Sequence, residues 1–87
     1  MHSVEMIECA IDLAKRLGYE IRQDWLGGAN GGGCELRGTK WLFLDLSLSP
    51  EERLEQLADA LADDPRVADA HVPTELRTYF NRRSEPH

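Results

Sequence analysis

The segment Lys40–Leu48 constrains the fold more than any other part of this 87-residue chain. It contains Trp41-Leu42-Phe43-Leu44, the longest uninterrupted apolar run in the sequence. Alternate residues of a β-strand face opposite sides of a sheet, so a strand here would be apolar on both faces. Such a strand is typical of the centre of a sheet that is covered on both sides. Helices of the same chain could cover both faces, or a second copy of the chain could cover one of them.

Two more strands precede this segment. Larger, mostly apolar side chains alternate with mostly charged ones over residues 19–26, which is typical of a strand with one solvent-exposed face. Cys34–Arg37 indicates another strand. Between them, Gly27–Gly33 contains five glycines in seven positions and predicts a long connection. Because the three strands follow one another directly, we expect a small antiparallel sheet.

The register of the second hairpin is open between two alternatives. A three-residue loop, Gly38-Thr39-Lys40, pairs Arg37 with Trp41 and places Cys34 and Leu36 on the same face as Leu42. A two-residue loop, Gly38-Thr39, pairs Leu36 with Trp41 and exchanges the faces of the third strand. The register therefore decides whether Trp41 belongs to the core or to the surface.

Three helices complete the predicted fold. Ser3–Leu17 carries an apolar stripe of helical period that ends at Gly18, and Ser49-Pro50-Glu51-Glu52 is a capping box that begins a helix to about residue 63. A last helix begins at Pro73, while residues 67–72 form either a linker or a fourth, edge strand. We therefore expect a single α+β domain over residues 1–87, in the order α-β-β-β-α-(β)-α, with 84–87 as a frayed tail.

Composition and charge exclude several classes of protein. A net charge of −6 disfavours a general nucleic-acid binder, unless Arg77, Arg82 and Arg83 form a basic patch. The longest apolar run is far shorter than the about 20 residues of a membrane span, and no signal peptide is indicated. Two cysteines 25 positions apart form neither a disulfide framework nor a metal-ligand set, so we expect a cytoplasmic protein.

The sequence offers no convincing catalytic set. His71 is the one histidine away from the chain ends, and no motif joins it to a nucleophile. Cys9 and Cys34 are predicted to be ordinary small side chains, with Cys34 facing the core. We therefore expect a protein that is not an enzyme and that needs no cofactor.

The glycine-rich connection is a candidate ligand loop. Backbone amides of such loops can bind phosphate, here with help from the side chains of Arg37 and Lys40. The dinucleotide fingerprint and the P-loop both require a helix after the glycines, whereas a strand follows Gly33. The alternatives are a plain connection between strands and a small-anion site at Gly31, Gly32 and Gly33.

The segment Leu57–Asp63 resembles the metal-binding helix of small zinc peptidases of the ImmA/IrrE kind, in which H-E-x-x-H follows a similar Leu-Ala. In those enzymes two histidines hold zinc and the glutamate activates its water. This chain has Asp59 and Asp63 at the histidine positions and Ala60 at the glutamate position. The resemblance implies a shared architecture and, at most, weak cation binding by Asp59 and Asp63 with help from His71.

A wider resemblance is to a set of short bacterial proteins. The resemblance rests on four segments of the chain. They are a glycine-rich stretch that leads into Gly33-Cys34-Glu35-Leu36-Arg37-Gly38, then Leu42-Phe43-Leu44-Asp45, the acidic helix 50–63 that begins with proline, and Pro73-Thr74-Glu75-Leu76-Arg77. This resemblance spans nearly the whole chain but brings no activity with it.

The function that these observations favour is an interaction module without catalysis. Aromatic side chains are frequent anchors of protein interfaces, and a sheet this small carries Trp25, Trp41 and Phe43. We expect the chain to associate with itself as a homodimer, or with another protein, through the aromatic face of the sheet. Cation binding and small-anion binding remain as the alternatives.

Overall fold

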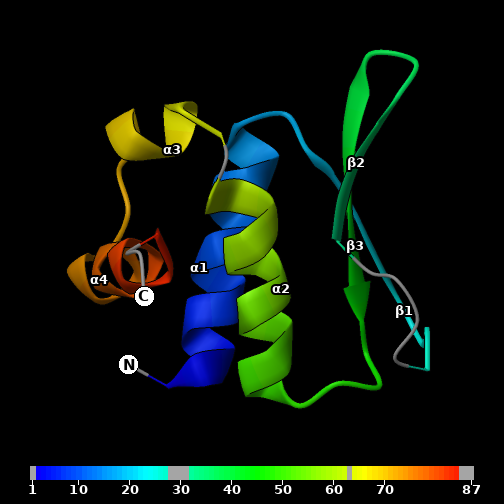
Figure 1. The fold of residues 1–87 in the computed structure, drawn as a ribbon, viewed down its shortest axis with the longest axis horizontal. Coiled ribbons are helices and arrows are strands. Elements are labelled where there is room, and N and C mark those ends of the chain that lie inside the picture. Colours follow the sequence, from blue (N-terminus) through cyan, green and yellow to red (C-terminus); the bar gives the residue numbers. More distant parts are fainter. Residues whose placement is uncertain (1, 28–31, 63, 85–87) are drawn as a thin grey trace.

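A computed structural model describes residues 2–27, 32–62 and 64–84 of the chain. Their order along the chain is α-β-β-β-α-α-α (Figure 1). The elements are α1 (Ser3–Arg16), β1 (Glu20–Asp24), β2 (Gly32–Leu36), β3 (Thr39–Asp45), α2 (Pro50–Ala62), α3 (Arg66–Asp69) and α4 (Thr74–Ser84). The predicted α+β class is confirmed. None of the helices within these residues is long and apolar enough to cross a membrane.

The first helix and the first strand are joined by a tight turn at Gly18. The backbone of Gly18 has a φ of +93°, a conformation that costs a residue with a side chain more than it costs glycine. This turn lets the N–H of Tyr19 donate to the carbonyl of Ala14 at 2.9 Å, which closes the end of α1. As a result β1 runs back along the helix that precedes it.

The sheet is mixed, which corrects the predicted antiparallel arrangement. Its strand order is β1-β3-β2, with β1 parallel to β3 and β2 antiparallel to β3. The connection from β1 to β2 is long enough to carry the chain past β3 to the other edge of the sheet, so β1 and β2 do not form a hairpin. The prediction that the apolar strand is the central one is confirmed, because β3 lies between the other two.

Both predicted registers of the second hairpin are wrong. The turn residues are Arg37 and Gly38, with φ of +52° and +80°, and Leu36 pairs with Thr39. Two positive φ values are typical of a type I′ turn, which matches the twist of the flanking strands. Cys34 therefore pairs with Trp41 and shares its face, so the prediction that Cys34 faces the core is also wrong.

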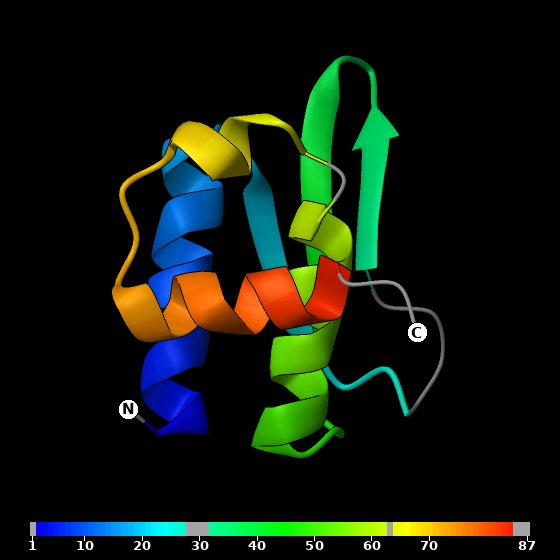
Figure 2. The same ribbon diagram turned by 60° about the vertical axis from the view of Figure 1, so that its left-hand side comes forward.

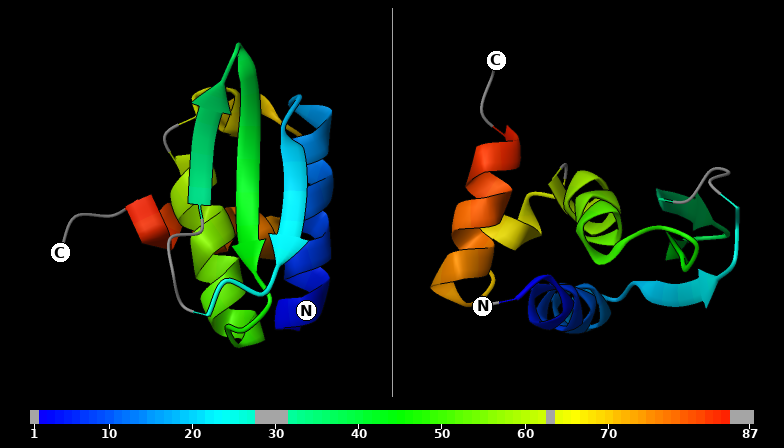
Figure 3. Two further views of the ribbon diagram at one scale, coloured as in Figure 1. Left: turned by 90° about the vertical axis from the view of Figure 1, so that its right-hand side faces the viewer. Right: turned by 90° about the horizontal axis from the view of Figure 1, so that it is seen from below.

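The helices all lie on one side of the sheet, so the molecule has three layers (Figures 1 and 3). Helices α1 and α2 pack side by side against the sheet, and α4 crosses both of them on the far side (Figure 2). We call the side of the sheet that meets α1 and α2 the inner face, and the opposite side the outer face. No element among the described residues covers the outer face.

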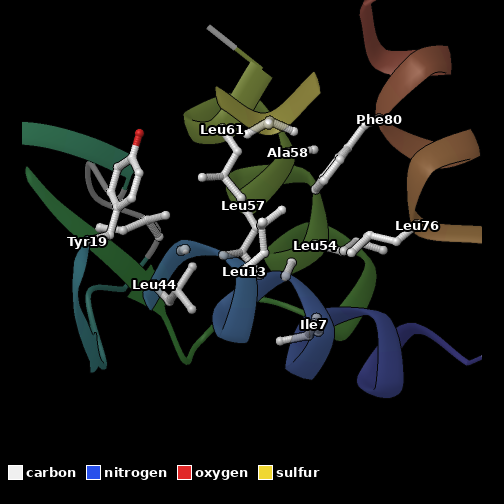
Figure 4. Close-up of a cluster of buried hydrophobic side chains, with 14 residues drawn as sticks. Ile7, Leu13, Tyr19, Leu44, Leu54, Leu57, Ala58, Leu61, Leu76 and Phe80 are labelled. Atoms are coloured by element: carbon white, nitrogen blue, oxygen red, sulfur yellow. The ribbon is translucent and has the colours of Figure 1, made fainter. Parts of the chain in front are cut away.

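The hydrophobic core lies between the inner face and the helices, and a second part lies between the helical layers (Figure 4). Leu42 and Leu44 of β3 are both fully buried in this core. Figure 4 shows Leu44 near Leu13 of α1. The buried apolar residues are Ile7, Ala10, Leu13, Ala14, Tyr19, Leu42, Leu44, Leu54, Leu57, Ala58, Leu61, Val67, Leu76 and Phe80.

Helix α2 begins as the sequence predicts. The N–H of Glu52 donates to the Ser49 hydroxyl, and the N–H of Ser49 donates to the Glu52 carboxylate, both at 3.2 Å. This reciprocal pair is a capping box, and Pro50 occupies the first helical position. The local pattern alone therefore places the start of α2.

The segment after α2 contains a one-turn helix, α3, instead of the fourth strand that was one of the alternatives. The guanidinium of Arg77 on α4 donates to the carbonyls of Val67 at 2.8 Å and Ala70 at 2.7 Å. These two carbonyls lie at the beginning and just after the end of α3, so Arg77 joins α3 to α4. Arg77 is thereby bonded to the backbone of its own chain.

Candidate functional site

The outer face of the sheet carries two aromatic side chains of β3. The rings of Trp41 and Phe43 stack with centroids 6.0 Å apart and an interplanar angle of 15°. Both side chains are half-buried, whereas Leu42 and Leu44 of the same strand are fully buried. The two faces of one strand therefore have similar composition but different surroundings.

A shallow hollow of about 560 Å³ lies beside these rings. Its lining comes from all three strands and from the hairpin turn: Arg22, Leu36, Arg37, Thr39, Trp41 and Phe43. Leu36 is 56% exposed and lines this hollow together with the two rings, so the apolar side chains here form a group. An exposed apolar surface with a polar rim is typical of an interaction site.

Charged residues border the aromatic pair on β1. Glu20 pairs with Trp41 and Arg22 with Phe43, and residues paired in adjacent strands point to the same side of a sheet. Asp24 follows with the same spacing, so β1 presents acidic, basic and acidic side chains in turn along the outer face. Glu20 and Arg22 are both exposed. The outer face thus combines an apolar centre with a flank that carries both signs of charge.

Trp25, the third aromatic residue of the predicted interface, is placed elsewhere. It follows the last residue of β1 and is 72% exposed, and it does not line the outer hollow. The backbone N–H of Trp25 donates to the Asp24 carboxylate at 2.8 Å, which is a local turn contact. The structure therefore brings Trp41 and Phe43 together and leaves Trp25 apart.

The predicted ligand loop is divided between two sides of the molecule. Gly32, Gly33 and Lys40 line a groove of about 400 Å³ between β2 and α2. Arg37 instead lines the outer hollow, because the turn at Arg37 and Gly38 separates it from Lys40. Gly31 lies outside the described residues. Arg37 and Lys40 therefore do not converge on one anion.

A buried carboxylate, Asp64, contacts two residues that line this groove, Tyr19 and Lys40. Asp64 accepts hydrogen bonds from the Arg66 guanidinium, at 3.0 Å and 2.7 Å, and from the Tyr19 hydroxyl at 3.0 Å. The Lys40 Nζ lies 3.9 Å from the same carboxylate. The hydrogen bonds from Arg66 hold the pKa of Asp64 well below its ordinary value, against the opposing effect of burial.

This network is structural in character. Burial, followed by the hydrogen bond to Asp64, raises the pKa of the Tyr19 hydroxyl, so that hydroxyl stays protonated and donating. Arg66 also donates to the carbonyl of Leu17 at 2.8 Å, which ties α3 to the end of α1. The Lys40 ammonium belongs to the same network, because it forms an ion pair with the Asp64 carboxylate.

The candidate cation ligands gain no support from their surroundings. Asp59 lines the groove between β2 and α2, His71 lines a separate hollow beside α1, and Asp63 lies outside the described residues. Within residues 2–27, 32–62 and 64–84, no group of three or more His, Cys, Asp or Glu side chains could hold a metal ion. The two cysteines are also apart, with Cys9 half-buried on α1 and Cys34 exposed on β2.

Comparison of the chain with models of known protein families, with curated proteins and with solved structures finds no match in any of the three.

Several residues of the outer face were not among the residues predicted for an interface. Leu36, Thr39 and Arg22 line the hollow beside Trp41 and Phe43. The two-residue loop already places Leu36 on the face of Trp41, whereas Arg22 joins this face only through the parallel pairing of β1 with β3. One signal was present: Arg37-Gly38 can form a two-residue turn, which moves the predicted loop back by one position.

Proposed function

We propose that this protein is an interaction module that associates with a second copy of itself through the outer face of its sheet. The observation that carries the proposal is the stacked pair Trp41 and Phe43, which stands on a face that no described element covers. Leu36, 56% exposed, extends the same apolar surface. Covering such side chains removes apolar area from water, which is the main driving force of association.

The size of the face indicates how strong this association is. Three strands about 4.8 Å apart and five residues at about 3.3 Å each make a patch of roughly 14 by 17 Å. Such a patch is smaller than the about 800 Å² that each partner contributes to a standard interface. We therefore expect a reversible dimer whose population depends on protein concentration, rather than an obligate one.

The test is the mass of the protein in solution, measured by light scattering behind a sizing column over a wide range of concentrations. The mass of the unaltered chain is expected to rise from 9.9 kDa toward twice that value as the concentration increases. Trp41→Ala removes the central anchor and is expected to keep the mass at that of one chain.

Trp25→Ala is the matched control, because it removes the same kind of side chain from an exposed position away from the outer hollow. It is expected to leave the association unchanged. Circular dichroism and urea unfolding establish that both variants are folded. A single-chain mass for the unaltered protein at every concentration would overturn self-association and would leave a different protein as the partner of this face.

A further inference from the structure

The geometry points to one particular arrangement of the two copies, in which Glu20 of each chain pairs with Arg22 of the other. This inference rests on the proposed self-association and specifies its orientation. It follows from the strand register, from the alternation of side chains along each strand and from the charges on β1.

Three rows of residues run across the middle of the sheet. Glu20, Trp41 and Cys34 form one row, and Arg22, Phe43 and Gly32 form another, and both rows face outward. Ile21, Leu42 and Gly33 form the row between them, which faces inward. The two outward rows are therefore equally far from the middle row, on either side of it.

Two sheets that pack face to face lie about 10 Å apart, with their strand directions within about 30° of each other. Consider a two-fold axis that lies midway between the two sheets, parallel to the middle row and therefore perpendicular to the strands. Rotation about this axis places each strand above the same strand of the partner, running in the opposite direction. This operation places each outward row above the other outward row of the partner. Trp41 then faces the partner's Phe43, and Phe43 faces the partner's Trp41.

The same operation pairs the charges on β1. Glu20 lies above the partner's Arg22, and Arg22 lies above the partner's Glu20, which gives two ion pairs at the rim of the interface. Both side chains are long, exposed and on the edge strand, so they can meet across the gap between the sheets. At the other edge of the sheet the small residues Cys34 and Gly32 of β2 face each other.

The competing two-fold axis runs parallel to the strands and gives a poorer match. It places β1 above the partner's β2, so Glu20 faces Cys34 and Arg22 faces Gly32, and no charge meets an opposite charge. Rim charges contribute little affinity but select the orientation of an interface. Charge complementarity therefore selects the axis along the middle row.

Charge reversal tests this arrangement. Arg22→Glu alone places two acidic groups at each pairing position, and Glu20→Arg alone places two basic groups there. Each single variant is expected to raise the dissociation constant of the dimer about tenfold or more. An equimolar mixture of the two variants is expected to recover the affinity of the unaltered protein, because every pair in the mixed dimer again joins an acid to a base.

The outcomes are distinct from those of the Trp41→Ala test. If Trp41→Ala abolishes association but neither charge variant weakens it, this orientation is wrong and the proposed function stands. Weakening by both variants without recovery in the mixture would also overturn the pairing, since the charges would then act within one chain. A protein that is monomeric at every concentration overturns the inference and the proposed function together.

Urea unfolding of each charge variant shows whether it is folded. Should a reversal not fold, Glu20→Gln and Arg22→Gln replace the pair of variants. With these, each single change is expected to weaken the dimer less than a reversal does. Mixing is expected to recover part of the affinity, because the mixed dimer keeps one ion pair, between Arg22 of the Glu20→Gln chain and Glu20 of the Arg22→Gln chain. Equal affinity of both neutral variants and the unaltered protein would contradict the pairing.

Discussion

The two faces of strand β3 differ in what covers them, although both are apolar. On the inner face, Leu42 and Leu44 are fully buried under α1 and α2. On the outer face, Trp41 and Phe43 are half-buried and the neighbouring Leu36 is mostly exposed. Apolar composition therefore predicts that a strand lies in the centre of a sheet, but it does not predict that both faces are covered within one chain.

This difference separates folding from association. Residues of the inner face stabilise the single chain, so their loss is felt in the free energy of unfolding. Residues of the outer face contribute less to folding and, in our proposal, more to the dimer. Substitutions on the two faces should therefore affect different measurements.

The largest expected effect on folding is that of Leu44→Ala on the inner face. Leu44 is fully buried, and such a truncation removes apolar contacts and leaves a cavity. We expect the free energy of unfolding to fall by about 2 to 5 kcal/mol, measured by urea unfolding at low protein concentration. A loss below about 1 kcal/mol would show that the inner face is not the main source of stability.

An intermediate effect is expected at the polar boundary of the inner side. Asp64→Asn removes the charge that Arg66 and the Tyr19 hydroxyl contact, and we expect a loss of about 1 to 2 kcal/mol near neutral pH. The Asp64 side chain is only 2% exposed, so water compensates little for the lost interaction.

The pH dependence of the same variant has a definite sign. The pKa of Asp64 is lower in the folded protein than its unfolded value of about 3.9. The stabilisation is therefore complete above pH of about 4 and is lost as the pH falls toward the folded-state pKa. Urea unfolding at a series of pH values should show the unaltered protein and Asp64→Asn converging as the solution becomes acidic; a constant difference would contradict this assignment.

The smallest expected effect on folding is that of Leu36→Ser on the outer face. Leu36 is 56% exposed, so we expect the free energy of unfolding to change by no more than about 0.5 kcal/mol. The same change removes apolar area from the proposed interface and should weaken the dimer in light scattering. If Leu36→Ser destabilises the single chain as much as Leu44→Ala does, the contrast between the two faces is wrong.

Local signals in the sequence predicted the helices α1, α2 and α4, but not the one-turn helix α3. The capping box at Ser49 and Glu52 begins α2, and the apolar stripe that ends before Gly18 delimits α1 to within one residue. Helices depend on residues three and four positions apart, so a short window contains most of their information.

Strand pairing was harder to predict because it is not local. Nothing within 20–24 shows that this strand lies parallel to β3 instead of pairing with its neighbour in sequence. The hairpin register depends on Arg37 adopting a positive φ, which residues other than glycine rarely do, so the sequence does not favour a turn there. Trp41 and Phe43 lie two positions apart on one strand, so they share a face in every register. Whether Leu36 and Arg22 lie beside them depends on how the neighbouring strands pair with β3.

The order of the three layers has a practical consequence for studying this protein. Helix α4 lies beyond α1 and α2 as seen from the sheet, so the end of this helix is far from the outer face (Figure 3). A dye or a surface tether attached there would leave the sheet unobstructed. Chains immobilised in this way would present the outer face to the solution, where the proposed binding of dissolved copies could be measured directly.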